Sequence, residues 1–169
     1  MPGEPAAVSV IISAYTFDRW DELVAAVRSA LAQTLPPAEV LVVVDNNDEL
    51  LAQATAELPE ALVVPNDQVP GLSGARMTGA HHATGTILAF LDDDAAAEPQ
   101  WLAEMAAAYA DEHVLGTGGS VVPNWRTERP RWMPHELDWV VGCSWAGTPR
   151  ERARIRNPIG ANMAMRADV

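Results

Sequence analysis

Residues 1–120 alternate between short runs of consecutive apolar residues and longer stretches with an apolar position every three or four residues. Apolar runs rich in β-branched residues are typical of strands buried on both faces, and the longer spacing is typical of helices that bury one face. The predicted strands are Val8–Ile12, Val40–Val44, Ala61–Val64, Thr86–Leu91 and Val114–Val122. The predicted helices are Asp21–Gln33, Glu49–Leu58, Gly71–Ala83 and Pro99–Ala110.

This alternation of strand and helix predicts an α/β fold with a mostly parallel sheet and helices on both faces. Sheets of this kind bind ligands beyond the carboxyl ends of their strands. After Pro123 the pattern changes to a Trp- and Arg-rich excursion that is partly irregular, with a short helix expected around His135–Val141 and a returning strand within Asn157–Arg166. We therefore divide the chain into a first part, residues 1–122, and an incomplete second part, residues 123–169.

Charge is unevenly distributed along the 169 residues, which carry a formal net charge of −12. Residues 1–120 hold three arginines against 18 acidic residues, whereas residues 121–169 hold eight arginines against five acidic residues. The acidic balance argues against binding to nucleic acid, which needs clustered cations. The chain has no lysine, and this excludes the P-loop and Schiff-base mechanisms.

The expected location is the cytoplasm. The single cysteine, Cys143, cannot form an internal disulfide, and we expect it to be a buried free thiol. The start of the sequence, MPGEPAAVSV, has neither the basic region nor the apolar region of a secretory signal. No apolar run approaches the ~18 residues of a membrane span.

Three consecutive carboxylates, Asp92-Asp93-Asp94, directly follow the predicted strand Thr86–Leu91. Side chains at i and i+2 of an extended segment share a face, so Asp92 and Asp94 are expected to point together and Asp93 the other way. Adjacent carboxylates repel and need a cation to stay ionised, and oxygen ligands select Mg²⁺ or Mn²⁺. Asp92 and Asp94 are therefore candidate metal ligands; the alternative is a solvated acidic turn that caps the next helix.

Two further segments end at the same predicted edge of the sheet. Asp45 follows Val40–Val44, where its carboxylate could accept a hydrogen bond from a base or a ribose; the alternative is a helix N-cap. Ser13, Ala14 and Tyr15 end the first strand and could frame a flat heterocycle, unless Tyr15 is an ordinary residue at the edge of the core.

The Gly-rich segment that starts at Gly71 contains Arg76, the lone arginine between Arg28 and Arg126. Glycines allow a ligand to approach the backbone closely, and an isolated cation in an acidic region suggests an anionic partner. A surface ion pair is the alternative.

The second part of the chain offers weaker candidates. Its tryptophans could form a platform for a sugar or a lipid, although packing within the excursion explains them equally well. Four alternating arginines would line one face if they formed a strand and would mean little in a solvated loop: Arg150, Arg152, Arg154 and Arg156.

The segments VSVIISAY, EVLVVVD, GLSGARMTGAHHATG and ILAFLDDDA, in this order and spacing, resemble the inverting family 2 glycosyltransferases with a GT-A fold. The resemblance covers residues 8–122 and implies a Rossmann-like sheet that binds a nucleotide-sugar donor, a UDP-sugar being the family default. It implies metal-dependent transfer of the sugar to an acceptor hydroxyl with inversion. Residues 1–122 would then be the donor-binding half, and residues 123–169 the start of the acceptor side.

The same resemblance suggests roles for individual residues. The nucleobase would be framed by Ser13-Ala14-Tyr15 and would donate a hydrogen bond to Asp45, and Arg76 would lie near the nucleobase or the diphosphate. Asp92 and Asp94 would be the DxD pair. The donor-binding residues implied in this way are Ser13, Ala14, Tyr15, Asp45, Gly71, Arg76, Asp92 and Asp93, and the metal ligands are Asp92 and Asp94.

The later segments HELDWVVGCSWAG and RNPIGANMAMR look like a subgroup that glycosylates lipid-linked acceptors, including hexuronic acid transferases acting on polyprenyl phosphate sugars. That resemblance implies membrane association on the cytosolic face in a full-length protein. An exposed sheet face would also suit a homodimer.

The chain departs from the family where Ser13, Thr16 and Met77 replace the usual Pro, Asn and Asn. The family's catalytic base lies beyond the GANMAMR-like strand, and this chain ends at Val169, so we expect an N-terminal piece with an unidentified base. Glu136 and Asp138 are the acids of the excursion that could substitute. The alternative function is a truncated or non-catalytic GT-A module that binds a nucleotide or a partner chain.

Overall fold

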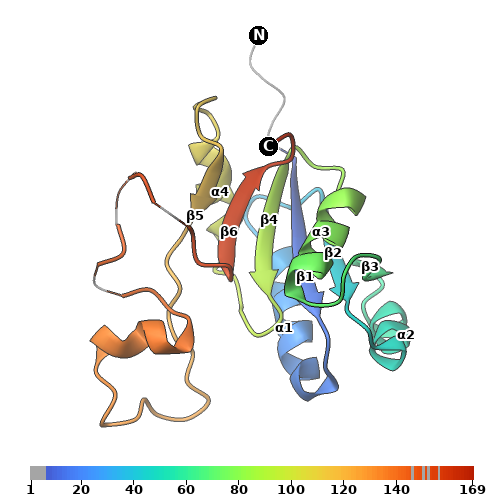
Figure 1. Ribbon diagram of the computed structural model, residues 1–169, viewed down its shortest axis with the longest axis horizontal. Helices are drawn as coiled ribbons and strands as arrows, with labels where there is room; N and C mark the ends of the chain where they lie inside the picture. Colours follow the sequence, from blue (N-terminus) through green and yellow to red (C-terminus); the bar gives the residue numbers. More distant parts are fainter. Residues whose placement is uncertain (1–6, 146, 150, 152, 156) are drawn as a thin grey trace.

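The computed structural model describes residues 7–169 except 146, 150, 152 and 156. The fold is built around six strands: β1 (Val8–Ala14), β2 (Glu39–Val44), β3 (Leu62–Pro65), β4 (Ile87–Asp92), β5 (Gly116–Gly118) and β6 (Asn162–Arg166). They form one sheet with the strand order β3-β2-β1-β4-β6-β5. The first four strands in this order are parallel neighbours, and β6 is antiparallel to both of its neighbours, β4 and β5 (Figure 1).

Helices cover both faces of this sheet, as the apolar pattern predicts. Three helices share one core with the alternate residues of the strands: α1 (Trp20–Leu31), α2 (Asp48–Glu57) and α4 (Trp101–Ala108). The opposite face carries α3 (Leu72–His82), which packs through Ala75 on the smaller core around Ile11 and Phe90. The α/β fold class with a mostly parallel sheet is therefore confirmed.

The two sides of the sheet meet at β1 and β4. Connections from β1 run outward through β2 to β3, and β4 lies on the other side of β1, so the strand order reverses between them. Such a reversal leaves a crevice at the carboxyl ends of the strands, where open α/β sheets bind their ligands. Ser13 lies directly beside Asp92 in the β1–β4 register.

Glu39, the first residue of β2, stabilises the amino ends of the parallel strands, at the opposite end of the strands from the crevice. Its Oε1 accepts hydrogen bonds from Ser9 Oγ (2.6 Å), the Thr84 amide (2.6 Å) and Thr84 Oγ (2.7 Å). Ser9 Oγ accepts in turn from the Gly85 amide at 2.9 Å. One carboxylate thus links the starts of β1 and β2 to the turn before β4, which sets the register of the strands that carry the site.

The sheet departs from the expected pattern at its last two strands. β5 spans Gly116–Gly118 rather than the predicted Val114–Val122, because the glycines that occupy it provide no side chains to pack. The returning strand predicted within Asn157–Arg166 is present as β6, and it inserts between β4 and β5, antiparallel to both.

The excursion lies between these two strands and spans residues 119–161, and those of its residues that the structure describes contain little regular structure (Figure 1). The predicted short helix at His135–Val141 is present as a 3₁₀ helix. Of the four alternating arginines, three lie outside the described residues, and Arg154 is not in a strand. Cys143 is buried as expected, and burial raises the pKa of its thiol. Within the part of the chain that the structure describes, every helix is too short or too polar to cross a membrane.

Candidate donor site

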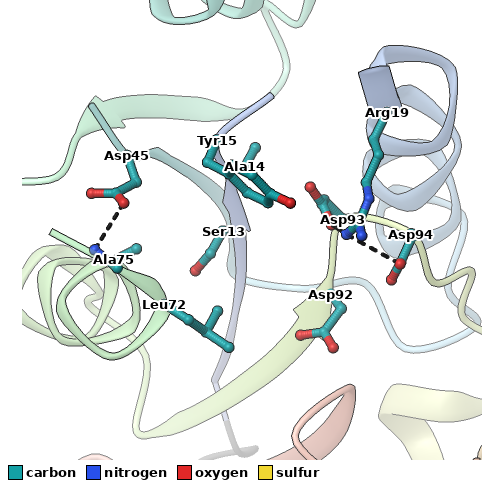
Figure 2. A pocket seen from close by; sticks show the side chains of 11 residues that line it. Ser13, Ala14, Tyr15, Arg19, Asp45, Leu72, Ala75, Asp92, Asp93 and Asp94 are labelled. Carbon is teal, nitrogen blue, oxygen red and sulfur yellow. Dashed lines mark hydrogen bonds and ion pairs between the residues drawn. The ribbon is translucent and has the colours of Figure 1, made fainter. Parts of the chain in front are cut away.

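A cavity of about 360 Å³ lies at the carboxyl ends of β1, β2 and β4, at the crevice where the strand order reverses. Side chains from all three strands and from the start of α3 converge on it, as Figure 2 shows. The residues that line it are Ser13, Ala14, Tyr15, Arg19, Asp45, Gly71, Leu72, Ala75, Asp92, Asp93 and Asp94.

The end of β1 forms one wall of the cavity. The Tyr15 side chain is 57% exposed, so it is not a residue at the edge of the core, and the Arg19 guanidinium lies 5.9 Å from its ring centroid. Ser13 is placed differently, because its Oγ is buried and has no hydrogen-bond partner among the described residues. A buried hydroxyl without a partner is costly, so Ser13 provides a polar group that a ligand could satisfy.

Asp45 sits at the end of β2 and holds the loop that leads into α3. Its Oδ2 accepts from the Gly71 amide at 2.8 Å and its Oδ1 accepts from Asn66 Nδ2 at 2.6 Å. The N-cap of α2 is Asn47, whose side chain accepts from the Leu50 amide at 3.0 Å. The alternative interpretation of Asp45 as a helix N-cap is therefore wrong.

Burial alternates along the aspartate triad, since Asp93 is 4% exposed while Asp92 and Asp94 face solvent more openly. The strand ends at Asp92 and a turn begins at Asp93, so the triad is not fully extended. Because of this turn, Arg19 Nη1 reaches both Asp93 Oδ1 (3.0 Å) and Asp94 Oδ2 (3.2 Å). Asp93 is therefore more buried than its two neighbours, but it shares Arg19 with Asp94 and is not separated from it as an extended segment predicts.

Asp92, the first carboxylate of the triad, pairs with Arg76. Arg76 Nη2 donates to Asp92 Oδ1 at 2.8 Å and to the Gly160 carbonyl at 3.0 Å. Its guanidinium also lies 5.9 Å from the ring centroid of Phe90. Arg76 thus joins the metal-ligand candidate Asp92 to the turn that precedes β6, and it is not among the residues that line the cavity.

Electrostatics within the triad depend on these arginines. Burial raises the pKa of Asp93, and the neighbouring Asp94 and Asp92 carboxylates raise it further, although Arg19 opposes this shift. The hydrogen bond to Asp93 raises the pKa of Arg19 in return. Asp93 Oδ2 is buried and has no partner among the described residues, so Arg19 supplies the neutralising contact of this carboxylate.

The carboxylate oxygens of the site suit a hard divalent cation as ligands, but they do not complete its coordination shell. Among the described residues no group of three or more His, Cys, Asp or Glu side chains could hold a metal ion. Asp92 and Asp94 line the cavity with carboxylate oxygens, which Mg²⁺ and Mn²⁺ prefer. Two carboxylates leave several positions for water or for the oxygens of a phosphate-bearing ligand, and the residues therefore fit a metal that arrives with such a ligand.

The structure brings together nearly all the residues that the sequence singled out. Arg76 contacts the triad from outside the cavity lining. Sequence reasoning missed Arg19, Leu72 and Ala75. Arg19 could have been found from its position, because it follows the first strand by five residues and therefore lies at the same carboxyl edge as the triad.

The excursion contributes no residue to the described cavity lining. Its Asp138 is buried and accepts two hydrogen bonds from Arg129 Nη2, at 2.7 and 2.9 Å. Arg129 also donates to the Met133 carbonyl at 3.1 Å and lies 5.3 Å from the ring centroid of Trp125. Asp138 therefore has a structural partner, and Glu136 is exposed.

Comparison with known proteins identifies the family. Residues 9–169 match the family model described as Glycosyl transferase family 2. The chain is 34% identical, over 166 residues, to the glucosyl-dolichyl phosphate glucuronosyltransferase of Haloferax volcanii, a match that covers 96% of this chain and 53% of that protein. It is 31% identical over 134 residues to the glycosyltransferase AglE of the same organism, covering 74% of this chain and 43% of that protein.

Solved structures agree with this assignment. A mannosyltransferase from Pyrobaculum calidifontis, determined in complex with GDP-Man and Mn²⁺, is 25% identical and superimposes with a TM-score of 0.56, covering 69% of this chain and 36% of that one. The chain belongs to glycosyl transferase family 2 and has the GT-A fold. It spans about half the length of the curated relatives that it matches.

Proposed function

We propose that this chain is the donor-binding part of a metal-dependent, inverting glycosyltransferase that uses a nucleotide-sugar. The observation that carries the proposal is the convergence of Tyr15, Asp45 and the aspartate triad on one cavity at the switch point of the sheet. This arrangement offers an aromatic surface and a carboxylate for a nucleoside at one end and carboxylates for a cation at the other. Family membership and the complex of the related mannosyltransferase with GDP-Man and Mn²⁺ support it.

In this proposal the residues divide the donor between them. Tyr15 and Ala14 frame the base, Asp45 accepts from it, and the unpartnered Ser13 hydroxyl satisfies a polar atom of the nucleoside. The Gly71 backbone, held by Asp45, allows the donor to lie close to the start of α3.

The diphosphate end of the donor would lie at the triad. Asp92 and Asp94 would hold Mg²⁺ or Mn²⁺, and a bound cation would stabilise the negative charge of the departing nucleoside diphosphate. Asp93 and Arg76 position this pair, because Asp93 anchors Arg19 beside Asp94 and Arg76 holds Asp92. Inversion requires a base that activates the acceptor hydroxyl, and no residue of the described cavity lining is assigned to that role.

For the acceptor we propose a lipid-linked sugar, and for the donor a hexuronic acid carried on a nucleotide, with UDP as the default. Support comes from the glucosyl-dolichyl phosphate glucuronosyltransferase that is 34% identical to this chain. The excursion exposes Trp132, Trp139 and Trp145, which suit contact with a sugar or an isoprenoid. Action at the cytosolic face of a membrane would follow from such an acceptor.

A second candidate is a module that binds a nucleotide, or a partner chain such as a second copy of itself, without turnover. The observation that favours it is the ion pair of Asp138 with Arg129, which occupies one of the two acids of the excursion that could serve as a base. Both candidates share the donor site, so the same first experiment applies to both.

The test is isothermal titration calorimetry of UDP, GDP and TDP with and without Mn²⁺, on the wild-type chain and on Asp94→Ala. Glu57→Ala is the matched control, because Glu57 is an exposed acidic residue at the end of α2 that does not line the cavity. Metal-dependent binding of one nucleotide that is lost only in Asp94→Ala would support the donor site and identify the nucleobase that it prefers. Absence of binding under every condition would overturn it. Transfer of sugar to a polyprenyl phosphate sugar by wild type would then separate the enzyme from the binding module.

A further inference from the structure

Arg19 bridges two walls of the cavity. It ends the 3₁₀ helix Phe17–Arg19 and precedes α1. Its guanidinium lies 5.9 Å from the Tyr15 ring centroid and contacts both Asp93 and Asp94 (Figure 2). Its side chain is 39% exposed, and it lines the cavity directly. Among the described lining residues, which include four aspartates, Arg19 is the only one with a basic side chain.

The two carboxylate contacts of Arg19 differ in their exposure to solvent. The Asp93 side chain is 6% exposed, and the Asp94 side chain is 48% exposed. A buried charge pair is costly to break because it leaves an uncompensated charge, whereas an exposed pair contributes little. Asp93 is therefore the anchor of Arg19, and the contact with Asp94 is the one that exchanges readily with another partner.

A diphosphate ligand bound beside the aspartate triad needs a cationic group there. The four lining aspartates would repel it, and Arg76 is committed to Asp92 and to the Gly160 carbonyl. A guanidinium has five N–H donors, so Arg19 can keep Asp93 and still donate to oxygens in the cavity. Its planar geometry suits phosphate oxygens well.

We propose that Arg19 binds the diphosphate of the donor and shares Asp94 with the divalent cation. Asp93 holds the guanidinium in place, Arg19 and the cation compete for Asp94, and the N–H donors of Arg19 contact the diphosphate oxygens. This inference rests on the proposed donor site, and it adds a residue for which the sequence pattern suggested no role. Arg19 is a binding residue here, and Asp93 is its positioning residue.

The test compares Arg19→Gln with Arg28→Gln, which removes an exposed arginine from the same region, on α1. Calorimetry measures the affinity of the nucleoside diphosphate and of the matching monophosphate in saturating Mn²⁺. Arg19→Gln should weaken diphosphate binding about tenfold or more, the effect of one charge-assisted hydrogen bond, and change monophosphate binding much less. Arg19→Lys should bind the diphosphate more tightly than Arg19→Gln but less tightly than wild type, because lysine keeps the positive charge but lacks the planar guanidinium with its paired N–H donors.

A second measurement uses Mn²⁺ alone and needs no activity. Electron paramagnetic resonance reports free and bound Mn²⁺, and Arg19→Gln should bind the ion more tightly than wild type because the competitor for Asp94 is removed. Opposite changes in the two affinities are the signature of the proposal, since a merely structural role would weaken both together with thermal stability.

The outcomes separate the two proposals. If wild type binds the diphosphate and Arg19→Gln binds it equally well, the assignment of Arg19 is overturned while the donor site stands. Equal losses for diphosphate and monophosphate, or unchanged Mn²⁺ affinity, also contradict it. If wild type binds no nucleotide at all, both the donor site and the role of Arg19 are overturned.

Discussion

Asp45 accepts a hydrogen bond from the Gly71 amide at 2.8 Å, and this contact joins the end of β2 to the first turn of α3. The same carboxylate accepts from Asn66 at 2.6 Å. The Asp45 side chain thus fixes the loop between β3 and α3. The loop borders the cavity through Gly71, so the shape of the cavity depends on a residue that the sequence presents as an isolated acid.

Asp45→Ala should therefore affect both stability and binding. Two donors lose their acceptor, and the expected loss of unfolding free energy is about 1–3 kcal/mol. Nucleotide affinity should fall about tenfold or more, because the variant also lacks the acceptor proposed for the base. Chemical denaturation and calorimetry measure the two effects. Unchanged affinity with reduced stability would limit Asp45 to a structural role.

Gly71 and Gly142 form a matched pair for a second prediction. Both have positive φ, +117° and +79°, and a Cβ built on either would meet no atom within 4 Å. Gly142 has the left-handed helical conformation (ψ 7°), and alanine there should cost about 1–2 kcal/mol. Gly71 has ψ 169°, a region that essentially only glycine adopts, so alanine there should cost at least as much, about 1–3 kcal/mol. Thermal unfolding should therefore show a loss for both variants, whereas only Gly71→Ala should weaken nucleotide binding. Equal effects on binding would contradict the placement of Gly71 in the site.

Arg76→Gln should uncouple Asp92 from the turn before β6. The variant loses a charge-assisted hydrogen bond to Asp92 and the contact with the Gly160 carbonyl. Stability should fall by about 1–3 kcal/mol, and Mn²⁺-dependent nucleotide binding should weaken because Asp92 is no longer held. Arg126→Gln is the control, since Arg126 is highly exposed and its ion pair, with the half-buried Glu22, involves no residue that lines the cavity. Similar losses in both variants would argue against a positioning role for Arg76.

Glu39 gives a prediction about pH. Burial raises the pKa of Glu39, but the hydrogen bonds from Ser9 and Thr84 outweigh this effect and hold it below its usual value. A carboxyl with a lowered pKa stabilises the fold above the unfolded pKa, and this contribution is lost as pH falls through the folded pKa. Glu39→Gln should therefore be less stable than wild type by about 1–2 kcal/mol at pH 7, and the difference should shrink below about pH 4.

The readouts for Glu39 are denaturation midpoints from pH 3 to pH 7 and nucleotide affinity at pH 7. Nucleotide affinity should stay near the wild-type value, because Glu39 lies at the amino ends of the strands and the cavity lies at their carboxyl ends. A stability difference that is constant over this pH range would show that the charge of Glu39 is not what matters.

Arg129→Ala should loosen the excursion without unfolding the sheet. Asp138 would remain buried without its partner, and a buried carboxylate of this kind is strongly destabilising. Limited proteolysis should then cut within residues 123–161 faster than in wild type, while nucleotide binding persists. Loss of nucleotide binding in parallel with cleavage would show that the excursion supports the donor site.

The fold was predictable from sequence to a large extent because the parallel strands are short, mostly apolar runs. Val40–Val44 and Ile87–Leu91 are buried on both faces, which is typical of strands in a parallel sheet. The predictions Val40–Val44 and Thr86–Leu91 lie within one residue of the observed bounds. β5 could not be bounded in this way, since its glycines have no hydrophobic pattern. The antiparallel insertion of β6 depends on long-range pairing with β4, which local sequence does not encode.

The site was predictable where chemistry follows a strand directly. Asp45 and the triad could be placed at one edge because the carboxyl ends of parallel strands coincide. Arg19 could not be singled out from residue type alone, because its role depends on the turn at Asp93 that lets one guanidinium reach two carboxylates. The partners of Asp45 were also hidden, since Asn66 and Gly71 approach it only after α3 has packed.

The position of β6 between β4 and β5 has a consequence for synthesis and folding. β5 bonds to the sheet through β6, so the strand at residues 116–118 cannot join until residues 162–166 have been made. During that interval the side of β4 that faces away from β1 is an unpaired edge next to the aspartate triad, open to pairing with other chains. Chains that stop before residue 162 should therefore aggregate during expression, and the excursion sets how long a nascent chain remains in this vulnerable state.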